Sequence, residues 1–247
     1  MRKQIHDNPI DHGRSCALSH GTWRRVGAKL ACAGAYVLMA GQLLLPSVAL
    51  AAEWVNVGGT QYNKGAGDEA GTWSWDGADD MKLNGYDGAG ISAQGNLNIG
   101  VTGTNTVTAD SLQSAIEVKD GNLAITGEGT LNATAEPQKS RSAVKVECGS
   151  LAISGDVTLN ATAGTDTIAV SGDGKTGGDV DIRGANVNVT ATNKVPHTIG
   201  IHTRAGNITI NEGADVHVEA EANGGVRCRC SLCRKHLLRA WRLHRGG

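Results

Sequence analysis

The chain of 247 residues contains no phenylalanine, and aromatic residues make up only 3% of it. A compact globular core normally uses aromatic side chains to fill its volume, so this composition argues against such a core. Glycine, in contrast, is abundant with 35 residues, and it separates short stretches rich in Thr, Asn, Val and Ile. This composition is typical of many short strands joined by turns.

A recognisable catalytic motif is also absent from the sequence. No serine or cysteine stands in a nucleophile motif. The histidines of the central part, His197, His202 and His217, alternate with apolar residues, as exposed positions on strands do. We therefore predict that the protein is not an enzyme.

Charge is distributed unevenly, although the formal net charge is only −1. Residues 52–226 contain ten Lys and Arg residues against 22 Asp and Glu residues, which gives a formal charge of −12. Residues 227–247 contain seven basic residues and no acidic residue. The acidic central part argues against nucleic acid as a partner and favours solubility or cation binding.

The first 51 residues have the features of an export signal. A basic stretch precedes an apolar run from Leu30 to Leu45, and Pro46 and the small-x-small motif Ala49-Leu50-Ala51 follow it. The apolar run contains two glycines and a glutamine and falls short of the roughly 18–20 apolar residues of a membrane span. We predict a signal peptide at 1–51, cleaved after Ala51, and a secreted, extracellular or cell-surface protein with no membrane segment in its mature form.

A five-residue pattern recurs through the central part of the chain. The pattern is Gly-x-(Leu/Val/Ile)-x-Ile, it recurs at intervals of 26, 28, 29 and 28 residues, and it starts at Gly95, Gly121, Gly149, Gly178 and Gly206. The glycines are expected at turns with a positive φ. A second apolar alternation follows each copy and a third precedes most copies, which predicts three short strands per repeat. One such unit cannot bury its own apolar face, whereas stacked units form a continuous core.

The repeat therefore predicts an all-β fold, a right-handed parallel β-helix (a solenoid) of about five coils at residues 90–225. One inward column is expected to contain Ile99, Ile125, Ile153, Ile182 and Ile210. An all-β sandwich is the alternative, but it does not explain a constant period. Residues 52–89 do not follow the period, and we predict that they form an N-terminal cap that closes the apolar interior.

A column of asparagines has the same period. Asn132, Asn160 and Asn188 are each 28 residues apart, and each begins an Asn-x-Thr sequence. They are either N-glycosylation acceptors or a ladder of side chains in a turn, hydrogen-bonded from coil to coil. We favour the ladder, because a repeat generates such sequences by copying itself.

Two groups of residues are candidates for carbohydrate binding. Trp73 and Trp75 are two residues apart in a strand-like segment, so they share a face and either cap the core or stack on sugar rings. Asp179, Asp181 and Arg183 alternate on one outward strand face. A carboxylate-rich binding or lyase site has such residues, and so does a solvated strand face.

A candidate metal site lies in a turn that contains glycine. The turn holds Asp76, Asp79 and Asp80, and carboxylates are common ligands of calcium, which takes six to eight oxygen atoms. The spacing does not match the Asp-x-Asn-x-Asp-Gly pattern of a calcium loop. We predict calcium as the cofactor of these three residues from their chemistry alone.

The sequence from Trp73 to about Gly225 resembles a known group of proteins. The Trp-Ser-Trp-Asp opening, the Leu-Asn-Gly turn at Leu83 and the repeated Gly-(Asn/Asp)-Leu-x-Ile coils are similar to those of bacterial secreted carbohydrate-binding-domain-containing proteins. These are related to a polygalacturonate-binding β-helix family. The resemblance implies an extracellular, non-catalytic, right-handed β-helix that attaches to acidic plant polysaccharides, in some members with bound calcium.

Together these features predict a secreted, non-catalytic carbohydrate-binding or adhesive surface protein whose partner is an acidic, pectin-like polysaccharide. A polysaccharide lyase-like enzyme on the same scaffold is one alternative. A purely structural surface stalk is the other.

Residues 226–247 differ from the repeat, because alternation, glycine spacing and acidic character all end before them. The sequence from Cys228 to His236 has three cysteines and a histidine, but it matches no standard zinc spacing. Leu237, Leu238 and Trp241 share one face of a basic amphipathic helix, as in helices that bind membranes. A shift of the reading frame explains all the changes at once, so we predict an aberrant basic, Cys/Arg-rich tail that is not a functional module.

Overall fold

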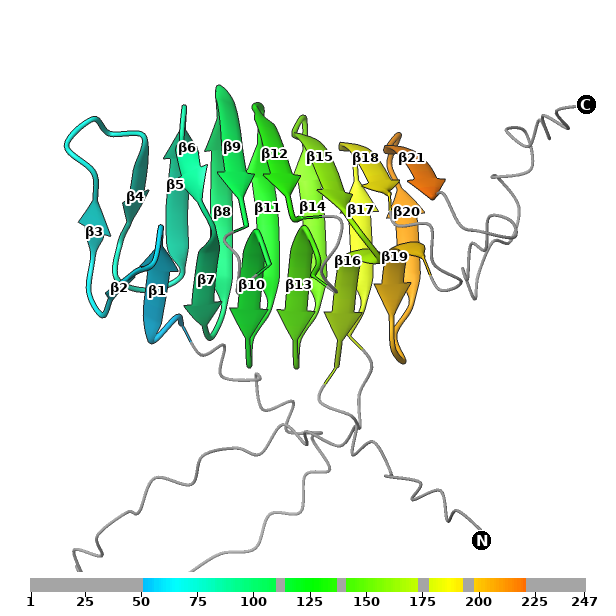
Figure 1. Ribbon diagram of the computed structural model, residues 1–247, viewed down its shortest axis with the longest axis horizontal. Coiled ribbons are helices and arrows are strands. Elements are labelled where there is room, and N and C mark those ends of the chain that lie inside the picture. Colours follow the sequence, from blue (N-terminus) through cyan, green and yellow to red (C-terminus); the bar gives the residue numbers. More distant parts are fainter. Residues whose placement is uncertain (1–50, 110–113, 137–140, 173–177, 193–197, 221–247) are drawn as a thin grey trace, which may run out of the picture. The chain divides into compact units, whose positions relative to one another are not determined.

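The computed structural model of the chain describes residues 51–109, 114–136, 141–172, 178–192 and 198–220 (Figure 1). These residues form 21 β-strands and no helix, which confirms the predicted all-β fold. A helix long and apolar enough to cross a bilayer is likewise absent from them. The predictions for residues 1–50 and 221–247 lie outside the described residues.

The strands belong to three sheets. Sheet 1 has the order β19-β16-β13-β10-β7-β1-β2 and contains β1 (Trp54–Val57), β2 (Thr60–Tyr62), β7 (Ile91–Gln94), β10 (Ile116–Lys119), β13 (Val144–Glu147), β16 (Asp166–Ser171) and β19 (Ile199–Thr203). Sheet 2 has the order β20-β17-β14-β11-β8-β5-β4-β3 and contains β3 (Ala66–Gly67), β4 (Trp73–Trp75), β5 (Asp80–Asn84), β8 (Leu97–Thr102), β11 (Leu123–Gly127), β14 (Leu151–Gly155), β17 (Val180–Arg183) and β20 (Ile208–Asn211). Sheet 3 has the order β21-β18-β15-β12-β9-β6 and contains β6 (Asp87–Ala89), β9 (Thr104–Thr108), β12 (Thr130–Thr134), β15 (Thr158–Ala163), β18 (Asn186–Ala191) and β21 (Asp215–Ala220).

Each coil contributes one strand to each sheet. β7, β8 and β9 form the first complete coil, and four further coils of three strands follow, ending with β21. Strands of successive coils pair in parallel in all three sheets. The fold is therefore the predicted parallel β-helix, with five three-strand coils and four interfaces between coils.

The predicted inward column is present in sheet 2. Strand pairing places Ile99, Ile125, Ile153, Ile182 and Ile210 in register. The first four are completely buried, whereas Ile210 is 36% exposed because it lies on the last coil. Apolar side chains at alternate strand positions thus form one core that runs along the stack.

The repeated glycines are required by close contact between coils. A Cβ atom on Gly149 would lie 1.9 Å from the carbonyl oxygen of Gly121, and one on Gly206 would lie 2.1 Å from that of Gly178. Of the five repeat glycines only Gly95 has a positive φ, of 98°. The expectation that positive φ selects these glycines is therefore wrong for the other four, where the backbone of the preceding coil leaves no room for a side chain.

Antiparallel strands cover the N-terminal end of the stack. β1 and β2 extend sheet 1, and β3 and β4 extend sheet 2, all by antiparallel pairing. Parallel pairing already begins with β5 and β6, which pair with β8 and β9. The solenoid thus starts at Asp80, ten residues before the expected boundary at residue 90, because Met81 and Leu83 continue the inward alternation without the glycine motif.

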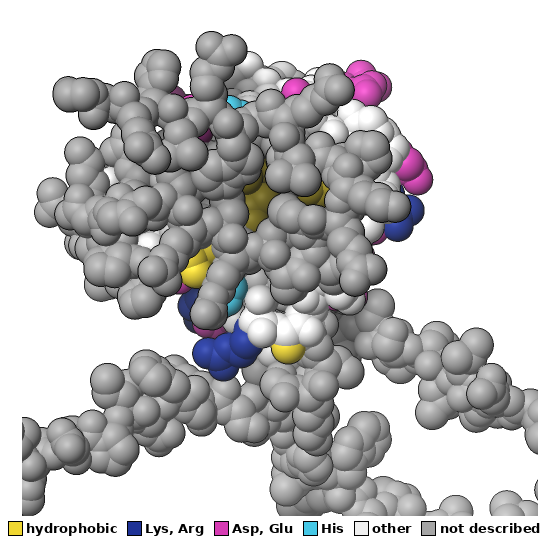
Figure 2. Space-filling model, turned by 90° about the vertical axis from the view of Figure 1, so that its right-hand side faces the viewer, with side chains coloured by type: hydrophobic (Ala, Val, Ile, Leu, Met, Phe, Trp, Pro, Cys, Tyr) yellow, Lys and Arg dark blue, Asp and Glu magenta, His cyan; other side chains and the backbone are white. Residues whose placement is uncertain are grey.

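The last coil has a less complete core. Ile201, Ile208, Val216 and Val218 are only partly buried, and β19, β20 and β21 are the terminal strands of their sheets among the described residues. Figure 2 views this end of the solenoid, where hydrophobic side chains are visible.

Replacing Ile153 with alanine is expected to lower the free energy of unfolding by about 2–5 kcal/mol, because the change leaves a cavity between Ile125 and Ile182. Ile210→Ala is the matched control, since it removes the same atoms from the same column at its exposed end. Its cost should be less than about half as large. Urea denaturation followed by circular dichroism measures both costs, and equal costs would contradict this description of the column.

Candidate functional site

The outer face of sheet 3 carries a regular array of polar side chains. β9, β12, β15 and β18 each direct three alternate side chains outward, and the strand register aligns them in three columns. The twelve uncharged side chains are Thr104, Thr106, Thr108, Thr130, Asn132, Thr134, Thr158, Asn160, Thr162, Asn186, Asn188 and Thr190. We call this set the Thr/Asn array. Its spacing is about 4.7–4.9 Å between strands and about 6.4–6.8 Å along a strand.

Side-chain hydrogen bonds connect the central column of the Thr/Asn array. Asn160 donates from Nδ2 to Oδ1 of Asn132 at 2.8 Å, and Asn188 donates to Oδ1 of Asn160 at 2.8 Å. This agrees with the predicted asparagine ladder, but the ladder lies in the middle of strands and not in a turn. Each amide uses one donor and one acceptor within the ladder, which fixes the orientation of the polar groups on this face.

Charged residues lie at both ends of the Thr/Asn array. On the last coil, Asp215, His217 and Glu219 continue the three columns, and Nε2 of His217 is 3.1 Å from Oε1 of Glu219. At the other end, Asp87 of β6 lies beside Thr106. The uncharged surface is therefore four strands wide within the acidic central part of the chain, residues 52–226.

Of the three residues predicted on the outer face of sheet 2, Asp181 and Arg183 form an ion pair, whereas Asp179 makes other contacts. Arg183 donates from Nε to Oδ2 of Asp181 at 2.9 Å, and its Nη2 lies 2.7 Å from the same oxygen. Glu212 lies 3.9 Å from Nη1 of Arg183. The hydrogen bond and the charge of Asp181 raise the pKa of Arg183 above its ordinary value, so this guanidinium is unsuited to act as a base.

Asp179 belongs to a different set of contacts. Its Oδ1 accepts a hydrogen bond from the backbone N–H of Asn207 at 2.7 Å, and its own N–H donates to Oγ of Ser150 at 3.1 Å. Two and three coils earlier, Oδ1 of Asn122 and Oδ1 of Asn96 accept the equivalent backbone hydrogen bonds, from Ser150 at 2.9 Å and from Asn122 at 2.8 Å. Asp179 thus stabilises a corner of the solenoid, as one step of a corner ladder.

The sequence contains a signal for this corner ladder. It lies in the polar second position of the repeated glycine motif and not in the apolar positions that predict the core. The second residue of every Gly-x-(Leu/Val/Ile)-x-Ile copy is Asn, Ser or Asp. These side chains accept hydrogen bonds from nearby backbone N–H groups in turns. The bonds here run between coils, which a single copy of the motif does not reveal.

Trp73 and Trp75 are part of the core at the N-terminal end. Their exposed fractions are 7% and 2%. The Trp75 indole donates from Nε1 to the carbonyl of Ala78 at 2.9 Å, and the Trp73 ring packs 5.3 Å from the ring of Tyr62. Neither ring face is free to stack on a sugar, so of the two interpretations the capping role accounts for both residues.

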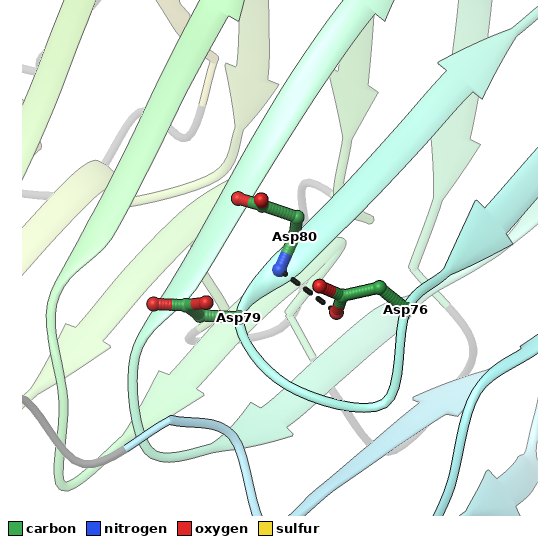
Figure 3. A group of neighbouring side chains, drawn as sticks. All are labelled: Asp76, Asp79 and Asp80. Carbon is green, nitrogen blue, oxygen red and sulfur yellow. Dashed lines mark hydrogen bonds between the residues drawn. The ribbon is translucent and has the colours of Figure 1, made fainter.

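The turn between β4 and β5 brings Asp76 and Asp79 close to Asp80, the first residue of β5 (Figure 3). One carboxylate oxygen from each lies within 4.8 Å of the others. Oδ1 of Asp76 accepts the backbone N–H groups of Ala78 and Asp80, at 2.8 and 3.2 Å, and thereby shapes the turn. Oδ1 of Asp80 accepts from Nδ2 of Asn98 at 3.0 Å.

This acidic turn has the chemistry for a divalent cation with oxygen ligands. Asp76 and Asp80 are exposed and Asp79 is half-buried. Because calcium takes six to eight oxygen ligands, water or ligand oxygens would have to complete the coordination. Calcium at this site stays a prediction.

A half-buried carboxyl group lies on sheet 1, at the first residue of β16 on the fourth coil. Asp166 pairs in register with Ile199. Burial raises the pKa of the Asp166 carboxyl group, and the charge of His202 opposes the shift.

Comparison with known proteins gave no match to a family model, a curated protein or a solved structure. The candidate site thus rests on the geometry described above and on the sequence pattern.

Asp166→Asn is expected to raise the free energy of unfolding near pH 7 by up to about 1 kcal/mol, after allowance for solvent screening. A raised pKa means that the folded state binds this proton more tightly than the unfolded state, so wild-type stability falls as the pH rises through the raised pKa. Near pH 2.5, where the carboxyl is protonated in both states, the substitution should have little effect. Urea denaturation at both pH values tests this, and an identical difference at both would contradict it.

Proposed function

We propose that the mature protein is an exported, non-catalytic β-helix that binds an extended polysaccharide on the outer face of sheet 3. The Thr/Asn array is the observation that carries this proposal. Its three columns offer hydroxyl and amide groups at the same three positions on four successive coils. A polymer lying along the stack therefore meets the same set of donors and acceptors again at each coil, and many weak contacts act together.

The arrangement of the charged residues supports binding without catalysis. Arg183, the candidate base on sheet 2, is paired with Asp181 and has a raised pKa. Asp179 holds the backbone of the next coil. The groups considered for a lyase-like reaction thus have structural partners.

The proposed ligand is an acidic, pectin-like polysaccharide, as the sequence resemblance implies. The central part of the chain has a formal charge of −12 and repels a polyanion at long range. Binding of such a polymer is therefore favoured by a bound cation that reduces this repulsion, and the acidic turn of Asp76, Asp79 and Asp80, at the start of β5 in sheet 2, offers carboxylate ligands for calcium.

The mature chain, residues 52–247, is expected to be retained on insoluble polygalacturonate in the presence of calcium, without release of unsaturated product. Thr134→Glu with Thr162→Glu adds two charges to the Thr/Asn array and should weaken retention about tenfold or more. Ala124→Glu with Ala152→Glu is the matched control, because it adds the same charges to the outer face of sheet 2 on the same two coils. Retention measured by sedimentation with the polymer should be similar for this control and the wild type.

Three outcomes would contradict the proposal. Equal weakening of retention by both pairs of substitutions would show that the ligand does not bind to the outer face of sheet 3. Release of unsaturated product would favour the lyase-like alternative, and absence of retention on any polysaccharide would favour the structural stalk.

Asp79→Asn with Asp80→Asn is expected to abolish the calcium dependence of retention and any rise of the melting temperature on addition of calcium. Asp76 is left in place because it shapes the turn. Calorimetric titration with calcium alone measures binding directly. Unchanged calcium binding in this variant would show that the cation binds elsewhere.

A further inference from the structure

The outer face of sheet 1 carries a tryptophan at a position where the pattern of the strand expects a polar residue. Val55 and Val57 of β1 are buried in the core, so Trp54, one position earlier, points outward. Antiparallel pairing places Trp54 beside Gln94 of β7. A large aromatic side chain on an outward strand face is an exception to ordinary burial, and such exceptions are informative about binding.

Polar side chains continue the column that begins at this tryptophan. β1, β7, β10 and β13 lie side by side in sheet 1 (Figure 1), and their register aligns four outward residues. We call these residues the Trp54 column: Trp54, Gln94, Lys119 and Glu147. All four are partly exposed, whereas Ser92 and Glu117 in the adjacent column are only 4% and 8% exposed. The Trp54 column spans three strand spacings, about 14 Å, and is the accessible track on this part of sheet 1.

Trp54 is available for a ligand in a way that the two core tryptophans are not. Trp73 and Trp75 are buried, whereas Trp54 is partly exposed. Within the part of the chain that the structure describes, the Trp54 indole N–H has no hydrogen-bond partner and no aromatic ring packs on this side chain. An accessible indole offers an apolar face and one hydrogen-bond donor, which together suit the flat C–H face and the hydroxyl groups of a sugar ring.

Lys119 contributes a second unpaired donor to the column. The nearby glutamates are both paired with Lys145, whose Nζ lies 3.1 Å from Oε1 of Glu117 and 2.5 Å from Oε1 of Glu147. The Lys119 ammonium makes no ion pair or side-chain hydrogen bond with any residue in the described ranges. Its three N–H donors are therefore available to a ligand.

Gln94 and Asp120 supply acceptors between the tryptophan and the lysine. Gln94 donates from Nε2 to Oδ2 of Asp120 at 2.7 Å, which fixes the orientation of the amide. Oε1 of Gln94 and Oδ1 of Asp120 accept no hydrogen bond from the described part of the chain. The Trp54 column with Asp120 thus offers both donors and acceptors, as hydroxyl groups require.

The charges of this face favour a neutral ligand. The face has two basic residues and three acidic residues, a formal charge of −1, and these are Lys119, Lys145, Glu117, Asp120 and Glu147. An acidic sugar gains no net attraction from this set. The hydroxyl groups of a neutral sugar, in contrast, donate to carboxylates and accept from an ammonium group, and hydrogen bonds to charged groups are the stronger ones.

We propose that the Trp54 column binds a neutral, hydroxyl-rich saccharide chain. Trp54 stacks on one sugar ring, and Gln94, Lys119 and Asp120 hydrogen-bond the hydroxyl groups of this ring and the next. The site lies on a different sheet from the Thr/Asn array and takes a ligand of different charge. It therefore goes beyond the function proposed above, and either proposal can fail without the other.

Calorimetric titration of the mature chain, residues 52–247, with cellohexaose, xylohexaose and mannohexaose tests the site. At least one of these neutral probes should bind, and Trp54→Ala should weaken this binding about tenfold or more, as truncation of a central aromatic residue does. Trp54→Phe keeps an aromatic ring and should weaken binding less than about threefold. This second variant keeps the test valid if Trp54→Ala lowers the melting temperature.

Lys119→Ala should weaken binding of the same probe about threefold or more, because it removes a charged donor. Lys82→Ala is the matched control, since Lys82 is an exposed lysine on the outer face of sheet 2. The control should bind like the wild type. Equal weakening by both substitutions would contradict a specific role of Lys119.

Tryptophan fluorescence reports on direct contact. Binding should shift the emission of the wild type, and the shift should be lost in Trp54→Phe although this variant still binds.

Four results would overturn the proposal. They are no binding of any neutral probe, unchanged binding by Trp54→Ala, tighter binding of hexagalacturonate than of the neutral probes, and loss of neutral-probe binding in the sheet 3 variant Thr134→Glu with Thr162→Glu. The last result would assign the neutral saccharide to the Thr/Asn array.

Discussion

The hydrogen bonds between successive coils are the interaction on which the rest of this structure depends. They pair the strands in parallel and in register in all three sheets, so each paired strand residue has a counterpart directly beside it in the next coil. This register brings backbones so close at the corners that a side chain on Gly149 would overlap the carbonyl oxygen of Gly121. The same register places Ile153 between Ile125 and Ile182, and the core follows from it.

The register also organises the surface. Asn160 bonds to its counterparts on both sides because the three strands align residue for residue. The threonine columns beside it repeat with the same spacing, and their regularity has the same origin as the core. The proposed polysaccharide-binding face therefore exists only in the stacked coils, since each coil contributes a single row of three side chains to the Thr/Asn array.

The period of the glycine motif was sufficient to predict the fold, because an interval of about 28 residues reports directly on the length of a coil. The inward positions of Ile99 to Ile182 followed from simple alternation. The start of the solenoid at Asp80 could not be predicted in this way, because β5 has inward Met81 and Leu83 but no glycine motif.

The role of Asp179 could not be predicted from the sequence either, since its partners Ser150 and Asn207 lie on neighbouring coils, 29 and 28 residues away in the sequence. For Trp73 and Trp75 the sequence left two roles open, and only their burial separates these roles.

All five coils share one register along sheet 3, and spin labels at Thr106 and His217 test this register most directly. These residues lie 111 positions apart in the sequence but occupy one column, four coil steps apart. Four steps of 4.7–4.9 Å give a backbone separation of about 19 Å. Double electron–electron resonance should therefore show a single narrow distribution near this distance, broadened only by the label linkers. A broad distribution, or a main distance beyond about 30 Å, is incompatible with stacking in this register and would contradict the fold described above.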